Sequence, residues 1–558
     1  MRNINKILQA GHAALQRGAF ADARRQLRGI THPKALHLLG LVEKADGNFD
    51  TALALLRRAA AKDSREPEIA KNIAALAQQM GQAELAETEY RRALNARPDM
   101  LQSALGLGQL LVDQERYEDA HTVYLNIAVK FSSDIYVQYG LATALLGLGE
   151  SEKAESIFDS LVEAGNRQPQ TLYMRGRCRL QLGKTTGALQ DLTTSHSASP
   201  NLLTFKALAN TYWMQNDQSS FDALIESTLA VPELAIAAVE VLRQSGDPAA
   251  ALTALNRASG NIALPADSWS AAAAAYIDMN DAESAEKFSR ESLTFLPDDP
   301  QGKRNLIVSL LMQGKADEAM PFIEGLREQS PNDQLWIAYE VTALRMLGSD
   351  RYASIVDIER FVRPYTLPVP DGFASLQDFN AAFLEYLKRW HGEQTHPLNQ
   401  SLRLGSQTPR DLSTIDEPLL KAFYKALDEP IRQYMSDVGN GSDHPLTARN
   451  TGDYRIAGGW SVQLHGGGNH VNHVHTDGWI SSSYYVAVPE ETRTDSNKAG
   501  WIKFSEPPFE TAPLCPPEKW IQPEAGMLVL FPSYLWHGTQ PISDDAVRVT
   551  APFDAVPV

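Results

Sequence analysis

The sequence predicts a two-part α + β protein, with an N-terminal α-solenoid followed by a C-terminal jelly-roll, or double-stranded β-helix. Small residues recur every 34 positions through the first two-thirds of the chain, which is typical of stacked helical pairs. The last third changes to short apolar runs separated by Gly and Pro turns, which favours a barrel of antiparallel strands. With 558 residues, the chain is also too long for one hydrophobic core.

The repeat shows in several sequence columns that keep one register. The columns are the alanines Ala52, Ala86, Ala120, Ala154, Ala188, Ala251, Ala285 and Ala319, the glycines Gly40, Gly108 and Gly176, the aromatics Tyr90, Tyr124 and Phe158, and the prolines Pro98, Pro200 and Pro297. Small residues let the two helices of a unit approach closely, and an aromatic side chain fills the gap to the next unit. Proline ends the second helix because it cannot continue the hydrogen-bond ladder.

This pattern resembles the tetratricopeptide repeat, and we expect nine or ten units over residues 1–347. Ala23 precedes Ala52 by 29 residues, which predicts an atypical first unit. Ala188 precedes Ala251 by 63 residues rather than 68, which predicts a degenerate unit around Phe221. The resemblance implies a groove that binds a peptide or protein substrate. The alternative is a purely structural role, such as dimerisation.

The remainder of the chain divides into a connector and a second domain. Residues 348–398 are predicted as a connector with a proline-rich stretch and a helix, and residues 399–558 as the jelly-roll. The predicted helices cover 376–390 and 417–435, the predicted strands 460–464, 481–488, 500–504 and 527–531, and a predicted turn Gly466–Gly468. Strand ends can converge on a metal at the mouth of such a barrel.

Candidate metal ligands gather in this domain. His473, His475 and Asp477 alternate along a predicted strand, so all three can face one cavity. His537 would join them from a distant strand. Two histidines and a carboxylate on one face of an iron ion leave three positions, enough for a 2-oxoacid and dioxygen. Arg548, eleven residues after His537, is placed to bind the distal carboxylate of that 2-oxoacid.

These residues make the C-terminal region resemble the 2-oxoglutarate- and Fe(II)-dependent oxygenases that bacteria fuse to tetratricopeptide repeats, and more distantly the prolyl hydroxylases. The resemblance is carried by Trp460, Gly466–Gly468, His473-Val474-His475, the 479–489 strand, 532–537 and 548–554. It implies Fe(II), 2-oxoglutarate and dioxygen as the cofactor and cosubstrates, and hydroxylation of a C–H bond coupled to decarboxylation. It also implies that Tyr485 helps to hold the cosubstrate carboxylate.

Two ligand sets remain open. His475, Asp477 and His537 form the favoured set, because a carboxylate offsets the iron charge. In prolyl hydroxylases, however, the first ligand lies six residues after a glycine and three after an aromatic. Counted from Gly467, that spacing makes His473 the first ligand, and His475 then replaces the usual carboxylate. The residue left over would orient a ligand through a hydrogen bond. No catalytic residue beyond the ligands is predicted.

Charge, hydropathy and cysteine content predict which partners and which cellular compartment to expect. The net charge of −17 argues against a nucleic-acid partner. No apolar run approaches membrane-spanning length, and the N-terminus lacks a signal-peptide core. The two cysteines, Cys178 and Cys515, fall in different predicted domains, so a reducing compartment, the cytoplasm, is expected.

The sequence therefore predicts an oxygenase that hydroxylates a peptide or protein positioned by the solenoid. One alternative is an oxygenase acting on a small biosynthetic molecule. The other is a non-catalytic repeat scaffold with a jelly-roll binding module. A zinc hydrolase could also use His-x-His and a distant histidine, but that function leaves Arg548 unexplained.

Overall fold

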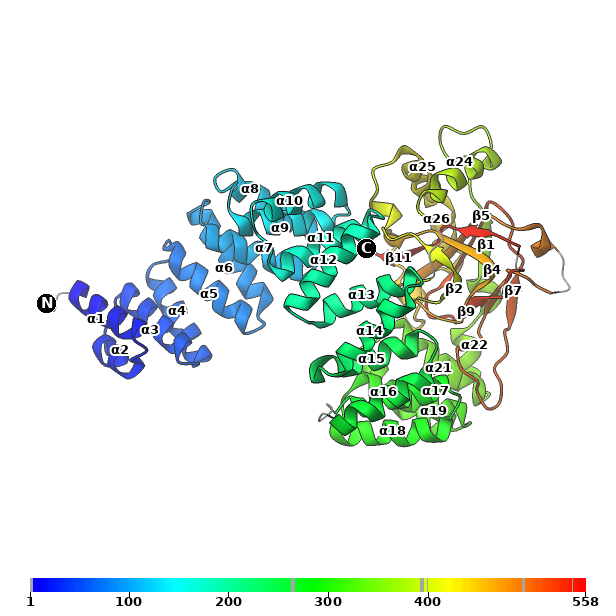
Figure 1. Cartoon of the computed structure of the whole chain (residues 1–558), viewed down its shortest axis with the longest axis horizontal. Helices are drawn as coiled ribbons and strands as arrows, with labels where there is room; N and C mark the ends of the chain where they lie inside the picture. Colours follow the sequence, from blue (N-terminus) through cyan, green and yellow to red (C-terminus); the bar gives the residue numbers. More distant parts are fainter. Residues whose placement is uncertain (1–3, 262–265, 392–395, 399, 494–496, 544) are drawn as a thin grey trace. The chain divides into compact units, whose positions relative to one another are not determined.

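The computed structural model describes residues 4–261, 266–391, 396–398, 400–493, 497–543 and 545–558. The chain divides into two compact units, Met1–Ser195 and His196–Val558. The first unit contains helices only in its described residues, whereas the second contains further helices and the β-sheets (Figure 1). Across the described residues, no helix combines the length and apolar character that a bilayer crossing requires.

Antiparallel helix pairs build the repeats, as the 34-residue period predicts. The helices that begin in the first unit are α1 (Ile4–Gln16), α2 (Phe20–Leu27), α3 (Pro33–Ala45), α4 (Phe49–Lys62), α5 (Pro67–Gln79), α6 (Ala83–Ala96), α7 (Leu101–Asp113), α8 (Tyr117–Ala128), α9 (Ile135–Gly147), α10 (Ser151–Glu163), α11 (Pro169–Gln181) and α12 (Thr185–Ala198). The second unit continues with α13 (Leu202–Met214), α14 (Gln218–Leu229), α15 (Pro232–Gln244), α16 (Pro248–Asn261), α17 (Ser268–Asp278), α18 (Ala282–Phe295), α19 (Pro300–Met312), α20 (Ala316–Gln329) and α21 (Gln334–Met346).

The constant 34-residue step between units follows from close packing at the glycine and aromatic columns. A Cβ atom on Gly108 of α7 would lie 2.4 Å from the Tyr124 ring, and one on Gly140 of α9 would lie 2.2 Å from it. The Tyr124 ring on α8 therefore fills the space between one unit and the next, and only glycine leaves room for it. Pro98, Pro200 and Pro297 each follow the second helix of a pair by two residues, as expected.

The two predicted departures from the period are confirmed. In the first pair, α2 has only eight residues. The pair containing Phe221 is compressed, because α13 begins at Leu202 and α15 at Pro232, a step of 30 residues instead of 34. This pair follows directly after the boundary between the two compact units, which lies between Ser195 and His196.

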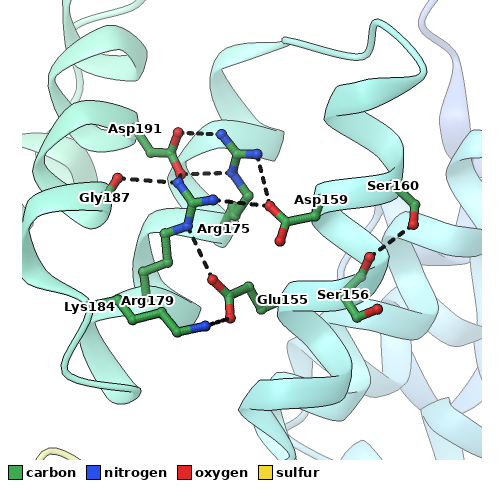
Figure 2. A network of polar contacts seen from close by, with 9 residues as sticks. All are labelled: Glu155, Ser156, Asp159, Ser160, Arg175, Arg179, Lys184, Gly187 and Asp191. Atoms are coloured by element: carbon green, nitrogen blue, oxygen red, sulfur yellow. Dashed lines mark hydrogen bonds and ion pairs between the residues drawn. The ribbon is translucent and has the colours of Figure 1, made fainter.

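A network of charges joins three helices near the end of the first unit (Figure 2). Arg175 and Arg179 lie one turn apart on α11, so both reach the same acidic neighbours. Arg175 Nη2 lies 2.6 Å from Asp191 Oδ1 on α12, and Arg179 Nη1 lies 2.8 Å from Asp191 Oδ2. Both guanidinium groups also lie 3.0 Å from Asp159 on α10. Asp191 is 4% exposed, so this part of the repeat core is ionic rather than apolar.

The remaining elements of the second unit form the C-terminal domain. Its helices are α22 (Asp350–Ile355), α23 (Ile358–Phe361), α24 (Leu376–Lys388), α25 (Pro418–Ala426) and α26 (Asp428–Val438). Its strands are β1 (Arg363–Thr366), β2 (Leu402–Gln407), β3 (Tyr454–Gly459), β4 (Val462–His470), β5 (Ile480–Ala487), β6 (Ile502–Phe504), β7 (Lys519–Ile521), β8 (Met527–Pro532), β9 (His537–Thr539), β10 (Arg548–Thr550) and β11 (Phe553–Pro557).

Two antiparallel sheets make up the β-structure. The larger runs in the order β1-β8-β5-β10-β4-β2, with β11 joining β5 to β3, and the smaller runs β7-β6-β9. Strands β8 and β5 pair over five residues, from Ile480 opposite Pro532 to Tyr484 opposite Leu528. The Tyr484 hydroxyl donates a hydrogen bond to Asn380 Oδ1 on α24, so this helix covers the outer face of β5.

Several boundaries differ from the predicted ones. Gly466–Gly468 is not a turn but lies inside β4, where Gly467 has a φ of +75° and bulges the strand. The helix predicted over 417–435 is two helices, α25 and α26, which meet at Leu427. The proline-rich stretch of the connector contributes β1, which pairs with β8. Asn399, the predicted start of the jelly-roll, lies outside the described residues.

Candidate active site

Three histidines converge where two extended segments meet. His473 and His537 form an antiparallel bridge, with His473 N donating to His537 O at 2.9 Å and His537 N to His473 O at 3.1 Å. His475 follows His473 by two residues and joins the same cluster. Among the described residues, one potential ligand atom from each of these three side chains lies within 4.8 Å of the other two.

A hydrogen bond at Nδ1 orients each imidazole ring. His473 Nδ1 lies 2.8 Å from the Val471 carbonyl oxygen, and His537 Nδ1 lies 3.0 Å from the Leu535 carbonyl oxygen. His475 Nδ1 lies 2.6 Å and 2.7 Å from the two oxygens of Asp554. Each acceptor holds the proton on Nδ1 and leaves the Nε2 lone pair free, which is the tautomer that a metal ligand needs.

The electrostatics of the cluster favour neutral rings at two positions. Burial, reinforced by the neighbouring His475, lowers the pKa of His473 to about 3. Burial and the other histidines also hold the pKa of His537 well below its usual value. At His475 burial acts in the same direction, but the Asp554 carboxylate outweighs it and raises the pKa. Neutral imidazoles bind metal ions, because protonation removes the lone pair.

Asp477 does not join the histidine cluster. The chain turns at Thr476 and Asp477, and Gly478 N donates back to the His475 carbonyl oxygen at 3.1 Å. The strand alternation that would place Asp477 beside His475 therefore ends one residue too early. The Asp477 side chain is exposed and lines the rim of the cavity, where its charge helps burial to raise the pKa of Asp333.

Asp554 on β11 supplies the carboxylate nearest to the cluster. Besides His475, its Oδ1 accepts a hydrogen bond from the Ser481 hydroxyl at 2.7 Å, and Ser481 Oγ lies 2.8 Å from Ser533 Oγ. The carboxylate is therefore held by two side chains and fixes the plane of the His475 ring. Asp554 lies 79 residues from His475, and no local pattern indicates it as a partner.

Arg548 and Tyr485 lie together, deep in the domain. Arg548 begins β10 and is 2% exposed, and Tyr485 on β5 is fully buried. The Arg548 guanidinium carbon lies 5.9 Å from the Tyr485 ring centroid. Arg548 Nη1 donates to the Gly500 carbonyl oxygen at 2.7 Å, but its Nε and the Tyr485 hydroxyl have no hydrogen-bond partner among the described residues. Burial lowers the pKa of Arg548 and raises that of Tyr485.

A cavity of about 650 Å³ connects the histidine cluster to Arg548. Its lining includes all three histidines, Arg548 and Asp554. Within the described parts of the chain, no ion pair joins Arg548 to a carboxylate. A buried guanidinium without a counter-ion is costly, so the cavity offers a binding site for an anionic group.

Ser401 makes polar contacts with two histidines of this cavity, which the sequence did not indicate. Ser401 Oγ lies 3.0 Å from His470 Nδ1 and 3.3 Å from His473 Nε2. Ser401 comes from the segment before β2, in which no periodic pattern is visible. Its position beside the histidines depends on the pairing of β2 with β4, in which Leu402 lies opposite His470.

The comparisons with known proteins agree with both parts of the chain. Residues 458–554 match the family model described as "Putative 2OG-Fe(II) oxygenase", and this segment runs from the last two residues of β3 to the first two of β11. Residues 40–228 match the model described as the coatomer epsilon subunit. No curated protein matches the chain.

Solved structures share the helical repeats at low similarity. The Pseudomonas aeruginosa pilF structure is 19% identical, and the match covers 35% of this chain and 89% of that one, with a TM-score of 0.31. A tetratricopeptide repeat protein from Parabacteroides merdae is 13% identical over 55% of this chain and 98% of its own, with a TM-score of 0.28. The P58(IPK) TPR domain is 18% identical over 62% and 98%, with a TM-score of 0.22.

The helix pairs and their 34-residue step identify the repeats independently of these weak likenesses. The matched segment of the chain, residues 458–554, contains all three clustered histidines, Arg548 and Tyr485. The chain therefore consists of a tetratricopeptide-like repeat region followed by a C-terminal antiparallel β-sheet domain that matches the 2-oxoglutarate–Fe(II) oxygenase family.

Proposed function

We propose that the C-terminal domain is a 2-oxoglutarate-dependent Fe(II) hydroxylase that acts on a peptide or protein side chain. The observation that carries the proposal is the shared cavity, in which a buried guanidinium without a counter-ion faces three clustered imidazoles, each held at Nδ1 by an acceptor. This pairing suits a ligand that has a carboxylate at one end and metal-binding oxygens at the other.

His473, His475 and His537 would hold the iron. This set follows the second ligand alternative, in which His475 takes the place of the usual carboxylate. Three neutral imidazoles leave the full charge of the metal uncompensated among its protein ligands. The Asp554 carboxylate, hydrogen-bonded to His475 Nδ1, would offset part of that charge through the ring.

Arg548 would bind the distal carboxylate of 2-oxoglutarate, with the Tyr485 hydroxyl as a second donor. Arg548 lines the cavity and Tyr485 lies beside it, each with an unused donor, and a carboxylate accepts hydrogen bonds from both types of group. Iron bound at the histidines would supply the redox chemistry that couples decarboxylation of 2-oxoglutarate to oxidation of a C–H bond. The protein residues would orient the cosubstrate and limit access of water to the site.

The repeats support a polypeptide as the substrate. Solenoids of helical pairs present extended surfaces that commonly bind peptides. In the first unit, α1, α3 and the start of α5 line a hollow of about 670 Å³ with both apolar and acidic side chains, including Leu8, Leu38, Ile69 and Glu66. A partner with apolar and basic residues would fit this surface.

The test is an anaerobic titration of the Fe(II)-loaded protein with 2-oxoglutarate, followed by visible absorption. Wild type should show the weak metal-to-ligand charge-transfer band of an iron-bound 2-oxoacid. His537→Ala should lose both iron and the band. His465→Ala is the matched control, because His465 lies on β4 but does not line the cavity. Wild type that binds Fe(II) but shows no band would contradict the proposal.

A further inference from the structure

The residue before one of the proposed ligands is anchored in the repeat region. Trp536, next to His537, is 4% exposed and belongs to an apolar cluster formed otherwise by α19, α20 and α21. Its ring centroid lies 5.7 Å from that of Tyr339 on α21. Trp536 is not part of the cavity lining, whereas His537 is. Adjacent residues of one segment therefore serve the metal cavity and the repeat core.

A buried hydrogen bond fixes the Trp536 ring against α21. Trp536 Nε1 donates to Thr342 Oγ1 at 2.9 Å, and the Thr342 hydroxyl donates in turn to the Ala338 carbonyl oxygen at 2.8 Å. Thr342 is 3% exposed, so water cannot replace either bond. The rotation of the indole ring, and with it the backbone before His537, is set by a side chain of the last repeat.

Backbone hydrogen bonds also connect both ligand segments to α21, one of them through Ser505. Arg345 Nη1 donates to the Ser505 carbonyl oxygen at 2.8 Å, and Ser505 N donates to the Trp536 carbonyl oxygen at 2.8 Å. At the other end of the helix, Gln334 N donates to the Thr476 carbonyl oxygen at 3.1 Å, directly after His475. This bond satisfies one of the N–H groups that a helix start leaves without a partner inside the helix.

The segment between the two other ligands packs on the same cluster. Val474 lies between His473 and His475, and it packs against the apolar cluster that contains Trp336 and Tyr339. His473 and His537 are bridged to each other through their backbones. The cluster that includes α21 therefore contacts the residue next to each of them, Val474 and Trp536.

We propose that α21 sets the spacing of the three histidines, and that Thr342 is a positioning residue for His537 that acts through Trp536. The last repeat is then part of the metal site as well as of the repeat region. This inference rests on the proposed metal site, but it does not require 2-oxoglutarate or any substrate.

The experiment compares Co(II) binding by full-length variants, with Co(II) alone as the probe because its visible spectrum reports ligand geometry. Thr342→Val keeps the shape of the side chain and removes the hydroxyl. We expect it to bind Co(II) about fivefold more weakly, the factor that one net hydrogen bond provides, with a changed spectrum. Thr342→Ser keeps the hydroxyl and should restore both. Trp536→Phe should match Thr342→Val, and the double variant should be no weaker than either single one.

Thr211→Val is the matched control. The Thr211 hydroxyl on α13 donates to the carbonyl four residues back, as in Thr342, and it bonds to no other described residue. A lowered melting temperature with wild-type Co(II) affinity and spectrum in Thr342→Val would mean that the bond only stabilises the fold, and would overturn the inference.

The two proposals fail in different ways. Wild type that binds Co(II) but shows no charge-transfer band with Fe(II) and 2-oxoglutarate overturns the proposed function and leaves the comparison of variants intact. If wild type binds no Co(II), selectively labelled imidazole NMR signals of the metal-free protein still report the ring positions. Unchanged signals from the three histidines in Thr342→Val would then overturn the inference.

Discussion

The same repeat architecture serves different purposes in two regions of this protein, as a comparison of α11 with α21 shows. Five of the 13 residues of α11 are buried, and Gln170 and Arg177, two turns apart on one face, are exposed. In α21, ten of 13 are buried, including Glu340 and Thr342, so this helix has no solvent-exposed face. A repeat that leaves one face exposed can bind a partner, whereas a repeat that is buried all round serves as core for the domain after it.

The largest expected effect follows from this difference. Removal of residues 1–347 deletes α21 together with the contacts of α13 and α19, and exposes Trp536 and its surroundings. We expect the remaining chain to be unfolded or aggregated, because a buried apolar cluster loses most of its members. Removal of residues 1–195 follows the boundary between the compact units and should leave a folded protein that binds iron.

Near-ultraviolet circular dichroism and Fe(II) binding of the two truncated chains measure this prediction. A folded, iron-binding fragment that starts at residue 348 would show that α21 is dispensable. Loss of folding in the fragment that starts at residue 196 would instead show that the two units stabilise each other.

The repeat period could be predicted because it is local. Each alanine or glycine column is repeated many times, and its spacing reflects contacts between neighbouring helices, such as that of Tyr124 with Gly108. The burial of the outer face of α21 could not be predicted, because it depends on residues such as Trp536 that lie nearly 200 positions away.

The same contrast applies to the site. His473, His475, His537 and Arg548 stand out in the sequence because their spacing and residue types are unusual together. Whether Asp477 joins them depends on one turn, and the strand alternation that favours it ends at Thr476. Asp554 and Ser401 reach the cluster only through strand pairing, so no spacing pattern indicates them.

Substitution of Arg548 should give the next largest effect. Arg548→Gln removes the charge but retains an amide donor, and we expect about 100-fold weaker binding of 2-oxoglutarate, as for loss of a buried charge-assisted pair. Iron affinity should stay within about twofold, since Arg548 does not contact the histidines. Isothermal titration of each ligand measures both constants.

The metal-free protein provides a second readout for the same variant. Because Arg548 is buried without an acidic partner, its replacement by a neutral side chain should leave the melting temperature unchanged or raise it. A clear loss of stability in metal-free Arg548→Gln would indicate that the hydrogen bond from Arg548 to the Gly500 carbonyl oxygen stabilises the fold more than the buried charge destabilises it.

Asp554→Asn should weaken iron binding without abolishing it. The amide can still contact His475 Nδ1, but it carries no charge and can present an N–H to the ring, which would favour the wrong tautomer. We expect a decrease of about tenfold in Fe(II) affinity, the lower end for partners of metal ligands. Asp554→Glu, which keeps the charge, should recover part of the loss, and equal affinities for wild type and Asp554→Asn would exclude this role.

The smallest expected effect lies in the first unit and leaves the metal site unchanged. Asp191→Asn removes the shared anion between Arg175 and Arg179, so two guanidinium groups remain close together with only Glu155 and Asp159 to offset them. We expect a loss of about 2 kcal/mol in the free energy of unfolding of this unit, less than for a fully buried pair because the arginines are partly solvated.

Asp99→Asn is the control for that substitution, because the pair of Asp99 with Lys130 is exposed and should contribute nothing measurable. Urea unfolding followed by circular dichroism gives the stability, and Fe(II) titration gives the state of the site. Since the described helices of the first unit pack mainly on helices of their own or the adjoining repeat, damage there should not reach the histidines. A change in iron affinity in Asp191→Asn would show that the first unit is coupled to the metal site, and the division between exposed repeats and the buried last repeat would then no longer hold.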